Sequence, residues 1–581
     1  MFDNIYKYIY RILIIIFILP ASNNHSFSQT LPNSKPTTIC NPLNLSYRFC
    51  LDTPSRREAA DPTVINFKNE YYLFASKSGG YWHSTDLIQW NLITTNDLPL
   101  EDYAPTAVVI DDTVYFMASS GKQGSKIYKT ADPKSGKWQV ANTTFPISLT
   151  DPDLFFDDDH LYLYYGCSNV NPIYAIELDR KTLMPIGVPI ACFNSNKETY
   201  GWERPGDYND KADAPWIEGA WMTKYSGKYY LQYAAPGTQF KSYCDGMYIA
   251  DKPLGPFRLA DNNPFSSKPE GFISGAGHSS LFKDNYGNYW QISTITISVK
   301  HMFERRLALF PAFFDTTNNV YAYTKFGDFP FIVPKKKIIS PAELSPHWML
   351  LSYEKPVTVS SVLAGHPATD AVDEDIRTYW SAASGNTNEW ISIDLQKKCT
   401  VNAAQLNFAE QGTKIYGRTE DIHYRYKLEY SNDNKTWKIL TDKSLNKEDA
   451  PHDYMELGVP VKARYWKIIN IHTAGGNFAV SGFRIFGTTG GVLPQKVADI
   501  HVIRDITDPC IVKLQWAKDK TATGYNIRYG SAPNKLYHTY QVFNKDSLII
   551  RNLNKGKRYY FTIESFNEDG VQEGTKTVFI K

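Results

Sequence analysis

The stretch TDPDLFFDDDHLYLYYG, residues 150–166, opens with Asp-Pro, continues with a short apolar run, turns at three aspartates and ends in a run rich in Tyr and Leu. Two apolar runs joined by such a turn are typical of a β-hairpin. The pattern occurs five times, with successive copies between about 43 and 67 residues apart. The five copies open at Asp61, Ala104, Asp151, Glu218 and His278.

A repeat of this period predicts a β-propeller. A four-stranded blade takes roughly 40–50 residues, and longer loops can be added between its strands. The sequence therefore predicts an all-β fold that begins with a five-bladed propeller over residues 40–337. The alternative, a β-sandwich of unrelated hairpins, would not repeat the same opening position.

The opening position of the copies is where we expect the chemistry. Equivalent positions of successive blades form a ring around the axis, so these side chains should face one central funnel. Four of the five are ionisable, and charges held close together are costly unless they are used or compensated. Two carboxyl groups across a cleft are the usual equipment of glycoside hydrolysis: one protonates the leaving oxygen and the other activates water.

Four motifs carry a resemblance to a known family: REAADP with Asp61, TDPDLFFDDD with Asp151, WIEGAW with Glu218 and GAGHSSLF with His278. On these motifs, residues of about 50–335 resemble glycoside hydrolase family 43, a set of inverting enzymes. The resemblance implies that Asp61 is the general base, that Glu218 is the general acid and that Asp151 tunes and orients the acid. It also implies that arabinofuranose or xylose is removed from plant polysaccharides or oligosaccharides.

Seven side chains are candidates for contact with the sugar or the pocket wall. The segments YWHSTDLIQW and DYAP supply the first two, the long loop GWERPGDYND the next two, and FERRLAL an Arg that could be either of two neighbours. They are Trp82, Tyr103, Trp202, Arg204, His278, Arg305 and Arg306. A guanidinium fork suits this role because it can bind several oxygens together. The long loop would favour exo-action, because it closes one side of the pocket.

His278 matches a histidine below the sugar pocket that in some family members helps to hold a metal ion, so it is also a candidate metal ligand. The chemistry itself is expected to require no cofactor. Tyr243 and Asp245 follow the strand that Glu218 opens and rank below the other candidates.

A new pattern follows the propeller. Residues 348–488 resemble a factor 5/8 type C, or discoidin, domain, which is a jelly-roll β-sandwich. Such domains often bind sugars, and the resemblance implies that a structural calcium ion could lie near the segment Asp-x-Asp-x-x-Thr. Here its ligands would be Asp373, Asp375 and Thr378, because oxygen-rich turns suit a hard cation. Whether this copy binds sugar is left open.

Residues 492–581 resemble a fibronectin type III β-sandwich, with Tyr559 as its tyrosine corner. We expect this domain to act as a spacer. Neither C-terminal domain contributes to the ring of opening residues, so both are expected to be dispensable for cleaving small substrates.

Residues 1–28 are predicted to be a signal peptide, because Lys7 and Arg11 precede a short apolar run and small residues follow it. No cysteine stands directly behind it, so a lipid anchor is not expected, and the protein is predicted to be secreted or periplasmic without insertion in a membrane. The net charge of +2 and the lack of large basic clusters argue against nucleic acid. We expect a monomer whose partner is a carbohydrate.

Two other accounts stay open. One is a carbohydrate-binding propeller lectin without catalysis, although the intact set Asp61, Asp151 and Glu218 argues against it. The other is the same hydrolase fold acting on another sugar, such as galactose, because related five-bladed propellers differ mainly in their pocket loops.

Overall fold

The computed structural model describes residues 37–99, 103–119, 125–574 and 577–580. The signal peptide predicted for residues 1–28 lies outside these ranges. Within them the helices are short 3-10 turns, and none has the length and apolar character that a membrane span needs.

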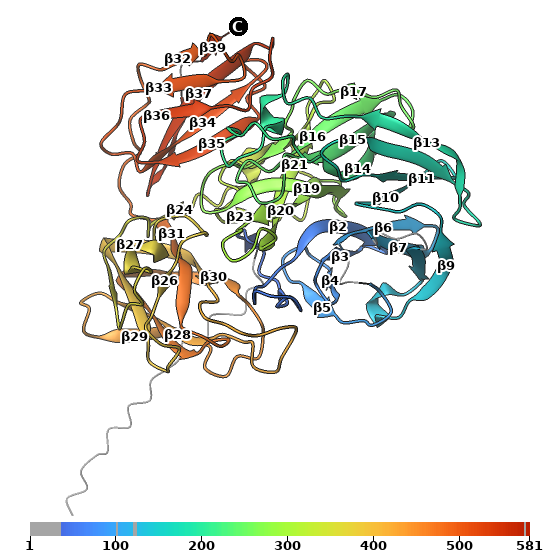
Figure 1. The fold of residues 1–581 in the computed structure, drawn as a ribbon. Helices are drawn as coiled ribbons and strands as arrows, with labels where there is room; N and C mark the ends of the chain where they lie inside the picture. The colour runs from blue at the N-terminus through green and yellow to red at the C-terminus, as the bar shows by residue number, and fades with distance from the viewer. Residues whose placement is uncertain (1–36, 100–102, 120–124, 575–576, 581) are drawn as a thin grey trace, which may run out of the picture.

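Five antiparallel sheets stand around a common axis (Figure 1), which confirms the all-β, five-bladed propeller. Blade 1 consists of β2 (Ala60–Phe67), β3 (Glu70–Ser76), β4 (Tyr81–Ser84) and β5 (Asn91–Ile93). Blade 2 consists of β6 (Tyr103–Ile110), β7 (Thr113–Ser119), β8 (Ser125–Thr130) and β9 (Gln139–Phe145), with η1 (Pro133–Ser135) before β9. Blade 3 consists of β10 (Asp153–Asp157), β11 (His160–Tyr165), β12 (Ile173–Leu178) and β13 (Pro185–Phe193), followed by η2 (Gly201–Glu203).

Blade 4 consists of β14 (Glu218–Tyr225), β15 (Lys228–Ala235), β16 (Cys244–Ala250) and β17 (Arg258–Leu259), with β18 (Ser266–Ser267) also paired to β16. Blade 5 consists of β19 (Ser274–Lys283), β20 (Tyr289–Thr296), β21 (Arg305–Phe314) and β22 (Val320–Ala322). The first strands of the blades, β2, β6, β10, β14 and β19, contact one another in a closed ring. A short strand β1 (Thr38–Ile39) pairs with β23 (Phe331–Ile332) and so joins the two ends of the propeller.

The discoidin-like sandwich follows, after η3 (Pro341–Leu344), and is coloured yellow to orange in Figure 1. Its elements are β24 (Met349–Leu350), β25 (Val357–Val359), η4 (Ala368–Ala371), β26 (Trp380–Ser381), β27 (Trp390–Phe408), β28 (Arg425–Ser431), β29 (Trp437–Asp442), β30 (His452–His472) and β31 (Ala479–Thr488). Register shifts within β27 divide this long strand, so that its first half pairs with β25 and its second half with β31. The two long strands β27 and β30 therefore contribute to both layers.

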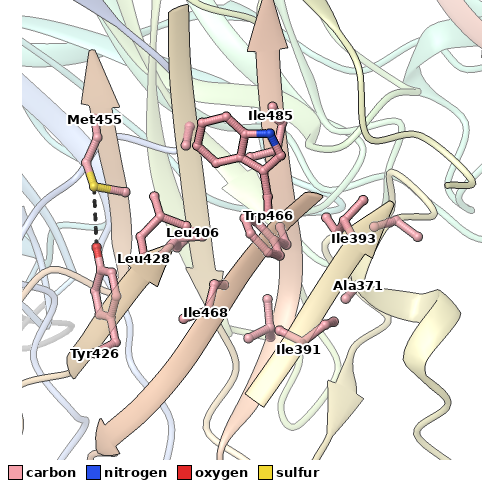
Figure 2. Packing of buried hydrophobic residues seen from close by; sticks show 14 of the residues in the cluster. Ala371, Ile391, Ile393, Leu406, Tyr426, Leu428, Met455, Trp466, Ile468 and Ile485 are labelled. Carbon is pink, nitrogen blue, oxygen red and sulfur yellow. Dashed lines mark hydrogen bonds between the residues drawn. The ribbon is translucent and has the colours of Figure 1, made fainter. Parts of the chain in front are cut away.

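Buried apolar side chains fill the space between these layers (Figure 2). Trp466 and Ile468 of β30 pack with Ile391 of β27, and all three are 0% exposed. At the edge of this core Tyr426 approaches the sulfur of Met455 at 3.6 Å. The sequence supplies this core by alternation, since Trp466 and Ile468 flank Lys467 in β30, and Ile391, Ile393 and Leu395 are the alternate residues of WISIDL that point inward.

The C-terminal sandwich, red in Figure 1, has two antiparallel sheets. Its strands are β32 (His501–Arg504), β33 (Val512–Gln515), β34 (Gly524–Gly530), β35 (His538–Phe543), β36 (Ser547–Ile550), β37 (Tyr559–Asn567), β38 (Gly570–Gln572) and β39 (Val578–Ile580). The hydroxyl of Tyr559 accepts a hydrogen bond of 3.0 Å from the backbone N–H of Asn554, as in a tyrosine corner. The fibronectin type III assignment itself stays a prediction.

Both sandwiches pack against the propeller. The C-terminal sandwich stacks Tyr537 on Tyr321 of blade 5 at 3.9 Å and pairs Glu564 with Lys325. The discoidin-like sandwich places Arg484 against the carbonyl of Asp328, which lies between blade 5 and β23, at 2.6 Å. Both C-terminal sandwiches therefore share buried or partly buried contacts with the propeller.

Candidate active site

The opening residues of the blades share an unusual backbone conformation. The φ angles are 54°, 48°, 50° and 41° at Asp61, Ala104, Asp151 and His278. Non-glycine residues seldom adopt this left-handed region, and surrounding contacts must hold them there. Hydroxyl groups of neighbouring strands do so by accepting the backbone N–H of the opening residue: Thr294 for Asp61 at 2.7 Å, Ser76 for Ala104 at 2.8 Å and Ser119 for Asp151 at 2.8 Å.

Glu218 does not occupy the same position as the other opening residues, which corrects the alignment made from the sequence. In blade 4 the left-handed residue is Gly219, with φ 61°. The strand pairing agrees, because Glu218 lies opposite Ala234 just before a register shift, as Ala60 does in blade 1. A Cβ on Gly219 would lie 2.6 Å from Cγ of His278, so this position cannot carry a side chain. The carboxylate comes instead from the residue before it.

Asp61 is held as a carboxylate. Its Oδ1 accepts a hydrogen bond of 3.0 Å from Arg305, its Oδ2 accepts one of 2.6 Å from Ser76, and Nδ1 of His278 lies 3.2 Å away. Burial alone would raise the pKa of this carboxyl, but the charges of Arg305 and His278 outweigh burial and lower the pKa below its usual value. Asp61 can therefore accept a proton from water.

Asp151 has the opposite environment. Burial raises its pKa to about 7, and the neighbouring charges of Glu218 and Asp61 add to this, although His278 opposes it. One carboxylate oxygen accepts the backbone N–H of Gly219 at 3.2 Å and lies 3.7 Å from Nδ1 of His278. Asp151 thus contacts the backbone beside Glu218 and shares His278 with Asp61.

His278 lies between the carboxylates. Burial lowers its pKa, but the negative charges of Asp61 and Asp151 more than compensate, and the pKa is raised overall. Beneath it Asp245 is buried, with its pKa raised to about 7 by burial, and it accepts a hydrogen bond of 3.0 Å from Gln291. A protonated imidazole at this point would hold the two aspartates at a fixed separation.

Glu218, the first residue of β14, is partly exposed to the funnel. Its Oε1 accepts a hydrogen bond of 2.5 Å from the hydroxyl of Tyr243, and Sγ of Cys167 donates to its Oε2 at 3.2 Å. Burial raises the pKa of the Tyr243 phenol well above its ordinary value, so this group stays a donor. One oxygen of Asp151, one of Glu218 and the Cys167 sulfur all lie within 4.8 Å of one another.

Arg305 and Arg306 are consecutive in β21 and point to opposite sides of the strand. Arg305 binds Asp61 and donates to Glu58 at 2.8 Å, and its guanidinium lies 5.8 Å from the ring of Tyr103. Arg306 instead donates to His452 of the discoidin-like sandwich at 3.0 Å. The structure thus assigns the site to Arg305, and Arg306 is wrong as a substrate contact because its side chain is buried in the interface between two domains.

The preceding segment has the same two-sided arrangement. Glu58 faces the active site and binds Arg305, whereas Arg57 faces the discoidin-like sandwich and pairs with Glu410 at 3.0 Å and Asp449 at 2.7 Å. The backbone N–H of Ala59 reaches the carbonyl of Arg305, so the two segments run side by side. One face of this pair of segments holds the base, and the other holds the second domain.

Two comparisons of sequence now bear on this geometry. Residues 55–311 match the model of "Glycosyl hydrolases family 43", and residues 356–482 match that of the "F5/8 type C domain". Residues 55–311 are a family 43 glycosyl hydrolase domain. The resemblance that the motifs gave is thereby confirmed, for the hydrolase domain and for the discoidin-like domain, and the chain carries a glycoside hydrolase domain.

Relatives of the family 43 domain carry several activities in their names. "Beta-D-galactofuranosidase xynD" of Aspergillus niger is 22% identical over 320 residues, which cover 48% of this chain and 82% of that protein. A "Xylosidase/arabinosidase" of Butyrivibrio fibrisolvens is 24% identical over 269 residues, which cover 40% of this chain and 48% of that protein. The chain thus spans about half the length of the second relative. A solved structure called "Crystal structure of a thermostable family-43 glycoside hydrolase" is 20% identical, covers 51% of this chain and 98% of its own, and has a TM-score of 0.40.

Three other predicted pocket residues lie away from the site of the family 43 domain. Trp82 is 0% exposed in the apolar core of blade 1, where its indole donates to Ser46 at 3.3 Å. Trp202 is also buried and donates to Asn554 of the C-terminal sandwich at 3.1 Å. Arg204 forms an ion pair with Asp508 of that sandwich. The last two come from a loop that we predicted to wall the pocket, and they bind a neighbouring domain instead.

Tyr103 lies at the edge of the site. Its ring is half-buried, with Phe303 at 5.7 Å and the ammonium group of Lys77 at 4.7 Å. Tyr243 ranked low among the candidates from the sequence, yet it binds Glu218. Cys167 and Glu58, which contact Glu218 and Arg305, were not predicted. Cys167 lies two residues after β11, the second strand of blade 3, and that position is the one signal that could have found it.

The calcium turn predicted in the discoidin-like domain makes other contacts. Asp373 accepts the Thr378 hydroxyl at 2.6 Å, and Asp375 pairs with Lys241 of the propeller at 3.0 Å. These carboxylates already bind a hydroxyl and an ammonium group, so their arrangement adds no support for a cation there. His278 turns its Nδ1 toward Asp61 and Asp151, and its role as a metal ligand stays a prediction.

Proposed function

We propose that the protein is an exported, inverting exo-glycosidase that removes arabinofuranose or xylose from plant polysaccharides or oligosaccharides. The observation that carries this proposal is the opposite electrostatic environment of Asp61 and Asp151. Asp61 is held ionised by Arg305 and His278, and Asp151 lies beside Glu218 with its own pKa raised to about 7. Asp61 thus supplies the ionised carboxylate that acid–base cleavage of a glycosidic bond requires, and Glu218, beside Asp151, is the second carboxyl group, the one that can donate a proton.

In the proposed reaction, Asp61 takes a proton from a water molecule as the water oxygen attacks the anomeric carbon. Glu218 gives its proton to the glycosidic oxygen as the bond from that oxygen to the anomeric carbon breaks. The Tyr243 hydroxyl orients Glu218 through its hydrogen bond to Oε1, and a carboxylate oxygen of Asp151 lies within 4.8 Å of one of Glu218. Attack by water on the face opposite the leaving group would invert the anomeric configuration.

The names of the relatives favour a furanose or xylose as the sugar. The Butyrivibrio protein is called a xylosidase/arabinosidase and the Aspergillus protein a β-D-galactofuranosidase. Galactofuranose is therefore the second candidate, and it differs from arabinofuranose in the substituent at C4, outside the reacting centre. The same carboxylates would serve either sugar, because the pocket loops decide which one fits.

The test is hydrolysis of aryl α-L-arabinofuranoside, β-D-xyloside and β-D-galactofuranoside, with the product anomer followed by proton NMR. We expect one sugar to be released with inverted configuration, and release to be lost in Glu218→Gln on a natural oligosaccharide. A product of retained configuration would contradict the roles given to Asp61 and Glu218. Binding of these sugars without hydrolysis of any would favour the lectin.

A further inference from the structure

A polar cleft of about 610 Å³ opens beside the active site. It is bounded by the 207–211 loop before β14, by the 239–240 segment between β15 and β16, and by the 298–302 loop between β20 and β21. Its fourth wall is Arg377, which belongs to the discoidin-like domain. The volume is within the range of about 300–1,000 Å³ that is typical of small-molecule sites.

Two residues that adjoin the cleft in the chain contact the arginine of the active site. Thr238, the residue before Gln239 of the cleft, accepts a hydrogen bond of 3.3 Å from Arg305, the arginine that binds Asp61. On the opposite wall, Phe303 follows the 298–302 loop and lies 5.0 Å from the same guanidinium. A saccharide whose terminal sugar is bound beside Asp61 could therefore continue into the cleft.

The lining suits a neutral saccharide. Tyr208 and Met302 are 46% and 47% exposed, although they are large and apolar, and such faces can pack against sugar rings. Its charged residues are of both signs, namely Asp207, Asp210, Lys211, Lys300 and Arg377, and Arg377 pairs with Asp207 at 2.9 Å. Lys211 lies 4.9 Å from the ring of Phe240. The lining therefore offers apolar faces and hydrogen-bonding groups, with little net charge to select an acidic ligand.

Arg377 holds two walls of the cleft at once. One of its amino groups donates to Asp207 at 2.9 Å, and the other donates to the carbonyl of Gln239 at 3.3 Å. Lys241, which lies between β15 and β16 like Gln239, pairs with Asp375 of the same turn of the discoidin-like domain. The turn that was predicted to bind calcium thus fixes the two propeller loops that form the cleft.

We propose that this cleft binds the neutral oligosaccharide from which the terminal sugar is cleaved, and that Arg377 is a positioning residue supplied by the discoidin-like domain. The proposal rests on the proposed function, because the cleft would bind the part of the substrate that lies on the leaving-group side of the cleaved bond. It also gives the discoidin-like domain a role in substrate selection that requires no sugar site of its own.

The experiment compares kcat/KM on two substrates that release the same sugar, an aryl glycoside and a neutral oligosaccharide. We expect Tyr208→Ala and Arg377→Ala to lower the ratio of oligosaccharide to aryl glycoside activity about 3- to 10-fold, the loss of one or two contacts, and mainly through KM. Arg425→Ala is the matched control, since Arg425 pairs with Asp421 on the surface of the same domain and should leave the ratio unchanged.

Equal losses on both substrates, or no loss on either, would overturn the proposal. Tyr208→Ala keeps the test valid if Arg377→Ala disturbs the contact between the domains. If the wild type cleaves neither substrate, the proposed function fails, and the cleft is then tested by calorimetric titration with the oligosaccharide alone. Weaker binding to Tyr208→Ala than to the wild type would support the cleft, and equal binding would overturn it.

Discussion

The phenolic hydroxyl of Tyr243 donates a hydrogen bond of 2.5 Å to Oε1 of Glu218, the proposed acid. We expect Tyr243→Phe to lower kcat about 10-fold on a natural glycoside with little change in KM, because the acid loses its orienting hydrogen bond. An aryl glycoside with a good leaving group needs less protonation and should lose less. Steady-state kinetics on both substrates checks this, and equal losses on both would show that Tyr243 does not act through the acid.

The proposed acid and base can be told apart by the leaving group. Glu218→Gln and Asp61→Asn should each lower the rate on a natural glycoside about 10²–10⁴-fold. On an activated aryl glycoside, Glu218→Gln should retain appreciable rate, because the leaving group no longer needs a proton, whereas Asp61→Asn should not. Rescue of Asp61→Asn instead would mean that the two roles are reversed.

Asp153 gives a prediction for the pH dependence of stability. It is buried beside the site, accepts the backbone N–H of Met222 at 2.7 Å, and burial raises its pKa to about 8. Between pH 4 and pH 8 the folded state therefore holds a proton that the unfolded state releases, so this group lowers stability as the pH rises. Asp153→Asn removes the titration and keeps an acceptor oxygen. Calorimetry should find its Tm above that of the wild type at pH 8, with a smaller difference at pH 5; the reverse order would contradict the raised pKa.

The interface of Arg57 with Glu410 predicts that the discoidin-like domain is needed for folding. Both side chains are nearly unexposed, and removing one partner of a buried pair costs about 3–5 kcal/mol. Glu410→Gln should therefore lower the free energy of unfolding by up to about that amount, since Arg57 keeps Asp449 as its second partner. Asp442→Asn, in the more exposed pair with Lys427, is the control and should change it much less.

Truncation extends the same reasoning. We expect a chain that ends near Lys337 to be insoluble or unfolded, because Arg57 and Arg306 would lose their carboxylate partners and the apolar contacts around them. This reverses the expectation from the sequence that both C-terminal domains are dispensable for small substrates. Circular dichroism and activity on an aryl glycoside decide between the two, and a folded, active truncation would restore the earlier view.

The sequence was most informative where the structure is local. Each blade is built from hairpins whose turns and alternating strands lie within a few dozen residues, so the repeat at Asp61 and Asp151 predicted the propeller. The offset of Glu218 was missed because a register shift changes which residue faces the axis without changing the hydrophobic pattern. Gly219 was the available signal, since a glycine beside the acid relieves a close approach by His278.

The errors at Trp202, Arg204 and Arg306 have a different physical origin. Each was assigned to the pocket because it lies near a catalytic motif in the chain. Their partners Asn554, Asp508 and His452 are more than 100 residues away in sequence, and nothing in the local pattern indicates such contacts.

The two-sided pair of segments at residues 57–59 and 305–306 also limits how this enzyme can diverge. A recombination that joined the propeller to a foreign binding module at the Pro- and Lys-rich linker would leave two arginines facing a surface without matching acids. The same arginines flank Glu58 and Arg305, so the damage would reach the base. The two domains therefore have to be inherited together, because single side chains of one are paired with those of the other. A new module could replace the discoidin-like domain only if the strands that carry the catalytic residues changed as well.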